Sequence, residues 1–133
     1  EHAVRALKDS LTAIDSYSPA LAERIRQDEE LCDHYEDILS TYLVKLSAEQ
    51  MGTAESEEAA ALLKSIGDFE RISDHAVNTL ESAEELRDKN LTFSPSAVAE
   101  FSVLSGAVSE ILDLSLACFE KNDSAIAAEV EPL

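Results

Sequence analysis

Long stretches without helix-breaking residues constrain this chain more than any other feature of its sequence. Its 133 residues include only 3 glycines and 3 prolines, which is too few for the many turns of a β-sandwich or β-barrel. Two of the prolines follow a serine, at Ser18-Pro19 and Ser94-Pro95. Serine suits the N-cap of a helix and proline its first helical position, so these dipeptides predict the starts of two helices.

The remaining breaks divide the chain into helices whose apolar residues recur at three- and four-residue steps. We expect helices near residues 2–15, 19–48, 55–88 and 95–121, with a short fifth helix from about Ser124. Long helices joined by short turns pack antiparallel, so the sequence predicts an all-α antiparallel bundle. The apolar stripes that would pack in it are Leu21, Ile25, Cys32, Tyr35, Leu39, Leu43 and Leu46; Leu62, Ile66, Phe69, Ala76, Leu80 and Ala83; and Phe101, Leu104, Val108, Ile111, Leu112 and Phe119.

The charge balance excludes several classes of partner. The chain carries 28 acidic and 10 basic side chains, for a net charge of −18, whereas nucleic-acid binding needs an excess of Lys and Arg. A hydrophobic content of 45% excludes a disordered acidic tail. No uninterrupted apolar run approaches the roughly 20 residues of a membrane span, so we expect no nucleic-acid partner and no membrane insertion. Two cysteines, too few for a disulfide framework, favour the cytosol.

Two pairs of acidic residues stand out from the solvated acids of the helix surfaces. Glu29 and Asp33 are four residues apart on the second helix. Glu70 and Asp74 have the same spacing on the third, so each pair shares one helix face, where like charges destabilise a helix unless an opposite charge lies nearby. The acids that we expect to be only solvated include Asp28, Glu30, Glu57, Glu58, Glu84, Glu85 and Asp88.

Helix geometry brings the two pairs to one place. With about 100° of rotation per residue, both pairs and also Glu36 lean to the same side of their apolar stripes. The midpoint between the pairs falls at Met51-Gly52, where the hairpin would turn, so the pairs would lie opposite each other. Converging carboxylates bind cations, take up protons or repel one another, and their oxygen atoms suit hard cations. His34 and His75 follow the two aspartates, either as ligands, as hydrogen-bond donors to the ligands, or as exposed side chains.

The third helix carries the most specific pattern in the chain. The stretch from Ile66 to Asn78 resembles the signature of PhoU-like domains, with its Glu-x-x-x-Asp core at Glu70 and Asp74. The stretch from Glu29 to Glu36 resembles the partner motif on the preceding helix. The similarity extends over residues 1–133, and it is closest to the PhoU-like tail of bacterial sodium/phosphate cotransporters.

The resemblance implies a bundle of two three-helix halves within a single domain of residues 1–133. The first half would comprise residues about 1–90, and residues about 95–133 would begin the second, so we expect a piece of a longer protein. Ser73 stands where the family usually has glycine, a small change that leaves room for the site. An apolar stripe left exposed on the fourth helix would favour self-association into a homo-oligomer.

The resemblance also implies a function without catalysis. It is that of a regulatory domain of a sodium-dependent phosphate transporter, on the cytoplasmic side of the inner membrane. Such a domain modulates phosphate uptake or signalling through the membrane-embedded transporter domain of the same longer chain. The family motifs hold divalent ions or multinuclear metal clusters, and we expect iron, Mg²⁺, Mn²⁺ or Zn²⁺. The residues that would bind them here are Glu29, Asp33, Glu70, Asp74 and Glu36.

Three other functions stay open on the sequence. A stand-alone PhoU-type regulator of phosphate transport would share the same motifs. A carboxylate-bridged metalloenzyme, such as a di-iron oxidase, would use Glu-x-x-His motifs, but Cys32 and Ser73 occupy the histidine positions. An acidic helical adaptor would leave the same carboxylates solvated and bind no metal.

Overall fold

The computed structural model describes residues 1–48, 52–130 and 132, and within them the regular structure is entirely helical. The bounds confirm the all-α fold and lie close to those expected from the sequence. Of the expected turn at Met51-Gly52, Met51 lies outside the described residues, and Gly52 is the N-cap of the third helix. The helices are α1 (His2–Asp15), α2 (Pro19–Ser47), α3 (Thr53–Asp88), α4 (Pro95–Lys121) and α5 (Ser124–Val130).

Both Ser-Pro dipeptides begin a helix, as predicted. The Ser18 side chain accepts a hydrogen bond from the Leu21 backbone N–H at 3.1 Å, and the Ser94 side chain accepts one from the Ala97 N–H at 3.2 Å. α4 ends at Asn122, whose φ of 50° lies in the left-handed region that asparagine tolerates better than most residues. Local sequence therefore explains where these two helices begin and where α4 ends.

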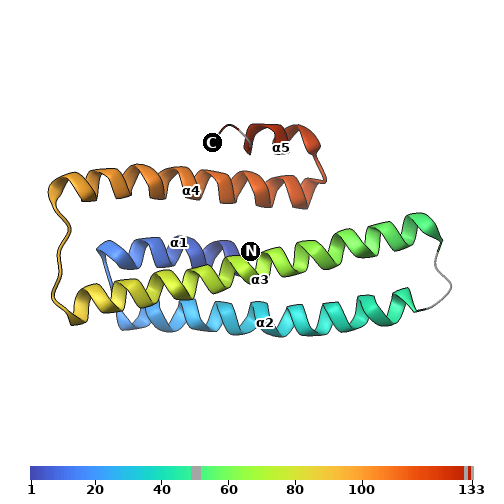
Figure 1. Ribbon diagram of the computed structural model, residues 1–133, viewed down its shortest axis with the longest axis horizontal. Helices are drawn as coiled ribbons and strands as arrows, with labels where there is room; N and C mark the ends of the chain where they lie inside the picture. Colours follow the sequence, from blue (N-terminus) through green and yellow to red (C-terminus); the bar gives the residue numbers. More distant parts are fainter. Residues whose placement is uncertain (49–51, 131, 133) are drawn as a thin grey trace.

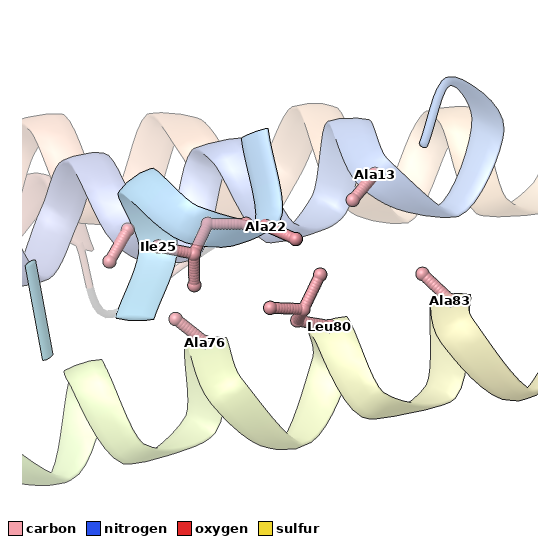
Figure 2. Packing of buried hydrophobic residues seen from close by; sticks show 7 residues of the cluster. Ala13, Ala22, Ile25, Ala76, Leu80 and Ala83 are labelled. Atoms are coloured by element: carbon pink, nitrogen blue, oxygen red, sulfur yellow. The ribbon is translucent and has the colours of Figure 1, made fainter. Parts of the chain in front are cut away.

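Helices α1, α2 and α3 pack as a three-helix bundle in which α2 and α3 run antiparallel (Figure 1). Their core is small and consists largely of alanine, with Ile25 and Leu80 as its largest side chains. Alanine lets helix axes approach closely but buries little apolar area per residue. The core residues are Ala6, Ala13, Ala22, Ile25, Ala76, Leu80 and Ala83 (Figure 2).

The first helix is much shorter than the two on which it packs. In Figure 1, α2 and α3 continue well past the N-terminal end of α1, toward the end of the hairpin where α2 stops and α3 starts. Helix α1 thus packs on one part of the hairpin, and Phe119 of α4 contacts Phe69 of α3.

The fourth helix runs alongside the bundle, and α5 folds back on it (Figure 1). Lys8 on α1 forms an ion pair with Asp113 on α4 at 2.6 Å, and the rings of Phe69 and Phe119 meet edge to face with centroids 5.1 Å apart. Leu112 is the one buried residue of α4. Of the apolar stripe expected to be exposed on the fourth helix, Leu104 and Phe119 are exposed, whereas Phe101, Val108 and Ile111 are half-buried.

The fourth helix is also long and apolar enough, by length and composition alone, to cross a membrane. Over 18 residues its mean hydropathy reaches 1.5, and only 6% of that stretch is buried. This helix contains no long uninterrupted apolar run because serine residues are interspersed among its apolar side chains. The absence of membrane insertion thus stays a prediction, which we take up with the proposed function.

Candidate metal centre

The five acidic residues expected to bind metal lie on the two long helices of the hairpin. Glu29, Asp33 and Glu36 lie on α2. Glu70 and Asp74 lie on α3. The three glutamates are half-buried and the two aspartates are exposed, so the group forms a partly desolvated site that water and ions can reach.

Electrostatic interactions between these acids run across the helix pair. The pKa of Glu29 is raised by partial burial and by the charges of Asp33 on its own helix and Asp74 on α3. The pKa of Glu70 is raised by partial burial, by Asp74, and then by the charges of Asp33 and Glu36 on α2. Glu29 is thus influenced by an acid of α3, and Glu70 by two acids of α2. We refer to the five acidic residues together as the acidic cluster.

Among the described residues, no basic side chain forms an ion pair with any of the five carboxylates. Glu36 accepts a hydroxyl hydrogen bond from Ser40 at 3.2 Å. Negative charge that is both clustered and partly desolvated raises the free energy of the folded state, and a cation would lower it.

The donor set fits a hard cation by its chemistry, because it consists of carboxylate oxygens. As the side chains stand, however, no three His, Cys, Asp or Glu residues among those described are gathered closely enough to hold a metal ion. Binding would therefore require the carboxylates to turn toward a shared ion. The side chains of His34 and His75, which follow Asp33 and Asp74 in the sequence, are exposed. Their exposure does not assign either histidine a role in the cluster.

Cys32 and Ser73 lie between the acids at the contact of α2 with α3. Ser73 is buried, and its hydroxyl donates to the backbone carbonyl of Glu70 at 2.7 Å. Burial raises the pKa of the Cys32 thiol, partly offset by Ser73. A small side chain at each position lets the helices approach closely, and both cysteines of the chain are free. These are the positions at which a di-iron oxidase would need histidine.

The expectation that Asp28 is a solvated acid is wrong. Its side chain is 2% exposed and accepts hydrogen bonds from His2 Nδ1 at 2.6 Å and from Arg5 Nε at 2.7 Å. Burial alone would raise the pKa of Asp28, but the bonds from Arg5 and His2 hold it below its ordinary value. The sequence did carry a signal, because Asp28 shares the helix face of Ile25 and Cys32 at spacings of three and four.

Glu84 is also not a solvated acid. It is half-buried, and it accepts hydrogen bonds from Arg26 at 2.8 Å and from the Tyr17 hydroxyl at 3.3 Å. The Arg87 guanidinium lies 4.2 Å from the centre of the Tyr17 ring, in the range of a cation–π contact. These contacts tie the turn between α1 and α2 to α3. The acids that are exposed as expected are Glu30, Glu57, Glu58, Glu85 and Asp88.

Comparison with known families identifies the family to which this sequence is similar. A family model of the PhoU domain matches residues 1–83, which include α1, α2, most of α3 and the whole acidic cluster. Comparisons with curated proteins and with solved structures gave no match. The resemblance beyond residue 83 and the division into two bundles stay predictions. The match indicates a role in phosphate regulation. Because it covers more than half of the sequence, the chain belongs to the PhoU domain family.

Proposed function

We propose that this chain is a non-enzymatic, metal-binding regulatory domain that acts on a sodium-dependent phosphate transporter. Membership of the PhoU domain family supports the role in phosphate regulation. The metal function is supported by a single observation, the uncompensated carboxylates that face each other across α2 and α3. The negative charge of Asp74 contributes to the raised pKa of Glu29, and that of Asp33 contributes to the raised pKa of Glu70.

A bound cation would be held by Glu29, Asp33, Glu36, Glu70 and Asp74. It would supply positive charge that offsets their mutual repulsion and would link α2 to α3 through shared carboxylates. The metal would thus set how firmly the two halves of the hairpin hold together. A regulatory domain can use such a link to change the surface that it presents to its partner.

The membrane-embedded part of the transporter is the partner that we propose, with this domain on the cytoplasmic side. We regard α4 as a helix of the soluble bundle and not as a membrane span. Two features support that choice, the ion pair of Lys8 with Asp113 and the ring contact of Phe69 with Phe119. A charged side chain such as Asp113 within a span would be costly.

Elemental analysis of the chain purified without chelator tests the metal function directly. We expect a stoichiometric metal in the unmodified chain and none after Glu70→Gln with Asp74→Asn. The matched control is Glu57→Gln with Glu58→Gln, which removes the same charge from exposed positions of α3 and should keep the metal. Equal metal content in all three proteins, or none in the unmodified chain, would refute the proposed site.

The transporter function needs a separate measurement. Phosphate uptake should be followed in cells that carry the full-length transporter with and without the same double substitution. We expect altered uptake with normal amounts of protein in the membrane. Unchanged sodium-dependent uptake would remove the transporter from the proposal while leaving the metal site standing.

A further inference from the structure

A cavity of about 340 Å³ lies between α1 and the middle of α4. Helix α4 approaches the three-helix bundle at α1, along which it lies in Figure 1. Small and hydroxyl-bearing side chains predominate around the cavity, so the two helices bury little apolar surface against each other there. We call these residues the α1–α4 interface: Leu11 and Thr12 of α1, and Ser102, Ser105, Gly106 and Ser109 of α4.

The α1–α4 interface contains a buried hydroxyl group without a partner. The Oγ atom of Ser105 is shielded from solvent and has no hydrogen-bond partner among the described residues. By contrast, Ser65 and Ser82 each donate to the backbone carbonyl four residues before them. A polar group that loses water without gaining a hydrogen bond opposes the contact that buries it. Burying Ser105 therefore weakens the attachment of α4 to α1.

The contacts that hold α4 on the bundle lie in its C-terminal half. Lys8 pairs with Asp113 at 2.6 Å, but the two side chains are 33% and 64% exposed, and an ion pair so exposed contributes little to stability. The ring of Phe119 contacts that of Phe69, yet Phe119 is 48% exposed. Leu112 is buried. For a helix of 27 residues, this is a weak attachment.

The segment that joins α3 to α4 can serve as a hinge. Residues 91–94 belong to no helix, and all four are exposed. A connection of this kind can absorb a change of direction without disturbing the helices on either side. At the other end of α4, α5 folds back and packs on it, so a movement of α4 would carry α5 with it.

We propose that α4 and α5 form an arm that detaches from α1 as a unit and turns about residues 91–94, while the three-helix bundle stays folded. The apolar core of that bundle comes from α1, α2 and α3, so it does not depend on the arm. Detachment gives the Ser105 hydroxyl access to water and uncovers one side of α1. A regulatory domain built in this way presents a different surface to its partner in each position of the arm.

Distances between two spin labels test the proposal. Labels are attached at Glu57→Cys on α3 and Glu110→Cys on α4, both exposed positions, after Cys32→Ala and Cys118→Ala remove the free thiols. Double electron–electron resonance should give one narrow distance from the docked arm and a longer, broader one from the detached arm. The ratio of the two populations measures the equilibrium. A single narrow distance, both in this protein and after Phe119→Ala, would overturn the proposal.

Substitutions at the two side-chain contacts should shift the ratio toward the detached arm. We expect Phe119→Ala to raise the detached-to-docked ratio about tenfold and Lys8→Gln to raise it about threefold. The matched controls are Leu104→Ala and Lys64→Gln, at exposed positions of α4 and α3, which should leave the ratio unchanged. Equal shifts in the variants and their controls would contradict attachment through these contacts.

The buried hydroxyl gives a prediction of the opposite sign. In the Phe119→Ala background, Ser105→Ala should lower the detached-to-docked ratio about fivefold, because it removes the polar atom that docking leaves without a partner. Ser102→Ala, at an exposed position of the same interface, should leave the ratio unchanged. A ratio that stays the same or rises after Ser105→Ala would contradict the role of this hydroxyl.

A second pair of labels checks that the arm moves as a unit. Labels at Glu110→Cys on α4 and Glu129→Cys on α5, both exposed, should give the same distance with and without Phe119→Ala. Circular dichroism should show the same helix content in both proteins. A broadened distance or a loss of helix would mean that α4 unfolds when it leaves α1, and the proposal would be wrong.

Discussion

Arg5 on α1 binds the buried carboxylate of Asp28 on α2 through both Nε and Nη2. This is a two-pronged contact between helices that are otherwise joined mainly by alanine. Because the Asp28 side chain is almost fully buried, its charge depends on Arg5 and His2 for solvation. The pair fixes how α1 sits on the hairpin more specifically than the small apolar core can.

Removing Arg5 should therefore destabilise the bundle. We expect Arg5→Ala to lower the free energy of unfolding by about 2 kcal/mol, because it leaves a buried carboxylate with one partner fewer. Urea denaturation measures the change. Arg71→Ala, at an exposed position without an ion pair in the described part of the chain, should cost less than about 0.5 kcal/mol. If Arg5→Ala costs the same in the Asp28→Ala background, the two residues are not coupled.

Stability without metal should pass through a maximum in mildly acidic solution. The pKa values of Glu29 and Glu70 are raised in the folded state, so these two carboxylates bind protons more tightly when the chain is folded than when it is unfolded. Their contribution to stability is therefore lost as pH rises through the folded-state pKa values. The lowered pKa of Asp28 acts in the opposite sense. Its contribution is complete above the unfolded value of about 4 and is lost as pH falls through the folded one.

Denaturation midpoints measured in chelator from acidic to neutral pH test the effect of the two glutamates and the effect of Asp28. Glu29→Gln with Glu70→Gln should remove the loss of stability on the neutral side, and Asp28→Asn should flatten the loss on the acid side. A curve for the unmodified chain that rises steadily from pH 4 to pH 7 would contradict the assignment of the neutral side to the two glutamates.

Metal should reverse the effect of removing the acidic cluster. In chelator, Glu70→Gln with Asp74→Asn should raise the melting temperature, because it relieves repulsion between half-buried and neighbouring carboxylates. With metal at a hundred times its dissociation constant, the unmodified chain should gain about 2.7 kcal/mol and become the more stable protein. Calorimetry with and without Mg²⁺, Mn²⁺ or Fe²⁺ measures both differences, and the same order under both conditions would argue against a shared ion.

Leu80 should be the most sensitive apolar position of the core. It is fully buried among alanines, so Leu80→Ala removes much of the large side-chain volume there and should cost about 3 kcal/mol. Leu104→Ala makes the same chemical change at an exposed position of α4 and should cost about 0.5 kcal/mol or less. Chemical denaturation of both variants compares them, and equal costs would mean that α4 is covered in solution.

The helices were predictable because their signals are local. Ser18 and Ser94 accept the N-cap hydrogen bonds expected of a serine before proline, and the apolar residues of the long helices recur at steps of three, four and seven residues. The influence of Asp74 on Glu29, and of Asp33 on Glu70, across the helix pair agrees with counting residues on either side of a hairpin. Such counting needs only the rise and rotation of a regular helix.

The partners of the buried acids were harder to predict because they depend on tertiary placement. Asp28 is buried by α1, and its partners precede it by more than twenty residues. Glu84 meets Tyr17 and Arg26 only once α3 lies against the first turn. The position of α4 was equally hidden, because a helix that is apolar on several sides does not indicate which side faces the bundle.

The three-helix packing around Ala22 and Leu80 has a consequence for how the hairpin opens. Amides near these two residues should exchange with solvent last. The acidic cluster lies next to this region, toward the turn of the hairpin. A cation bound by the cluster would limit fraying of the hairpin before it reaches the residues on which α1 packs. Metal supply would then set how much of the hairpin stays paired.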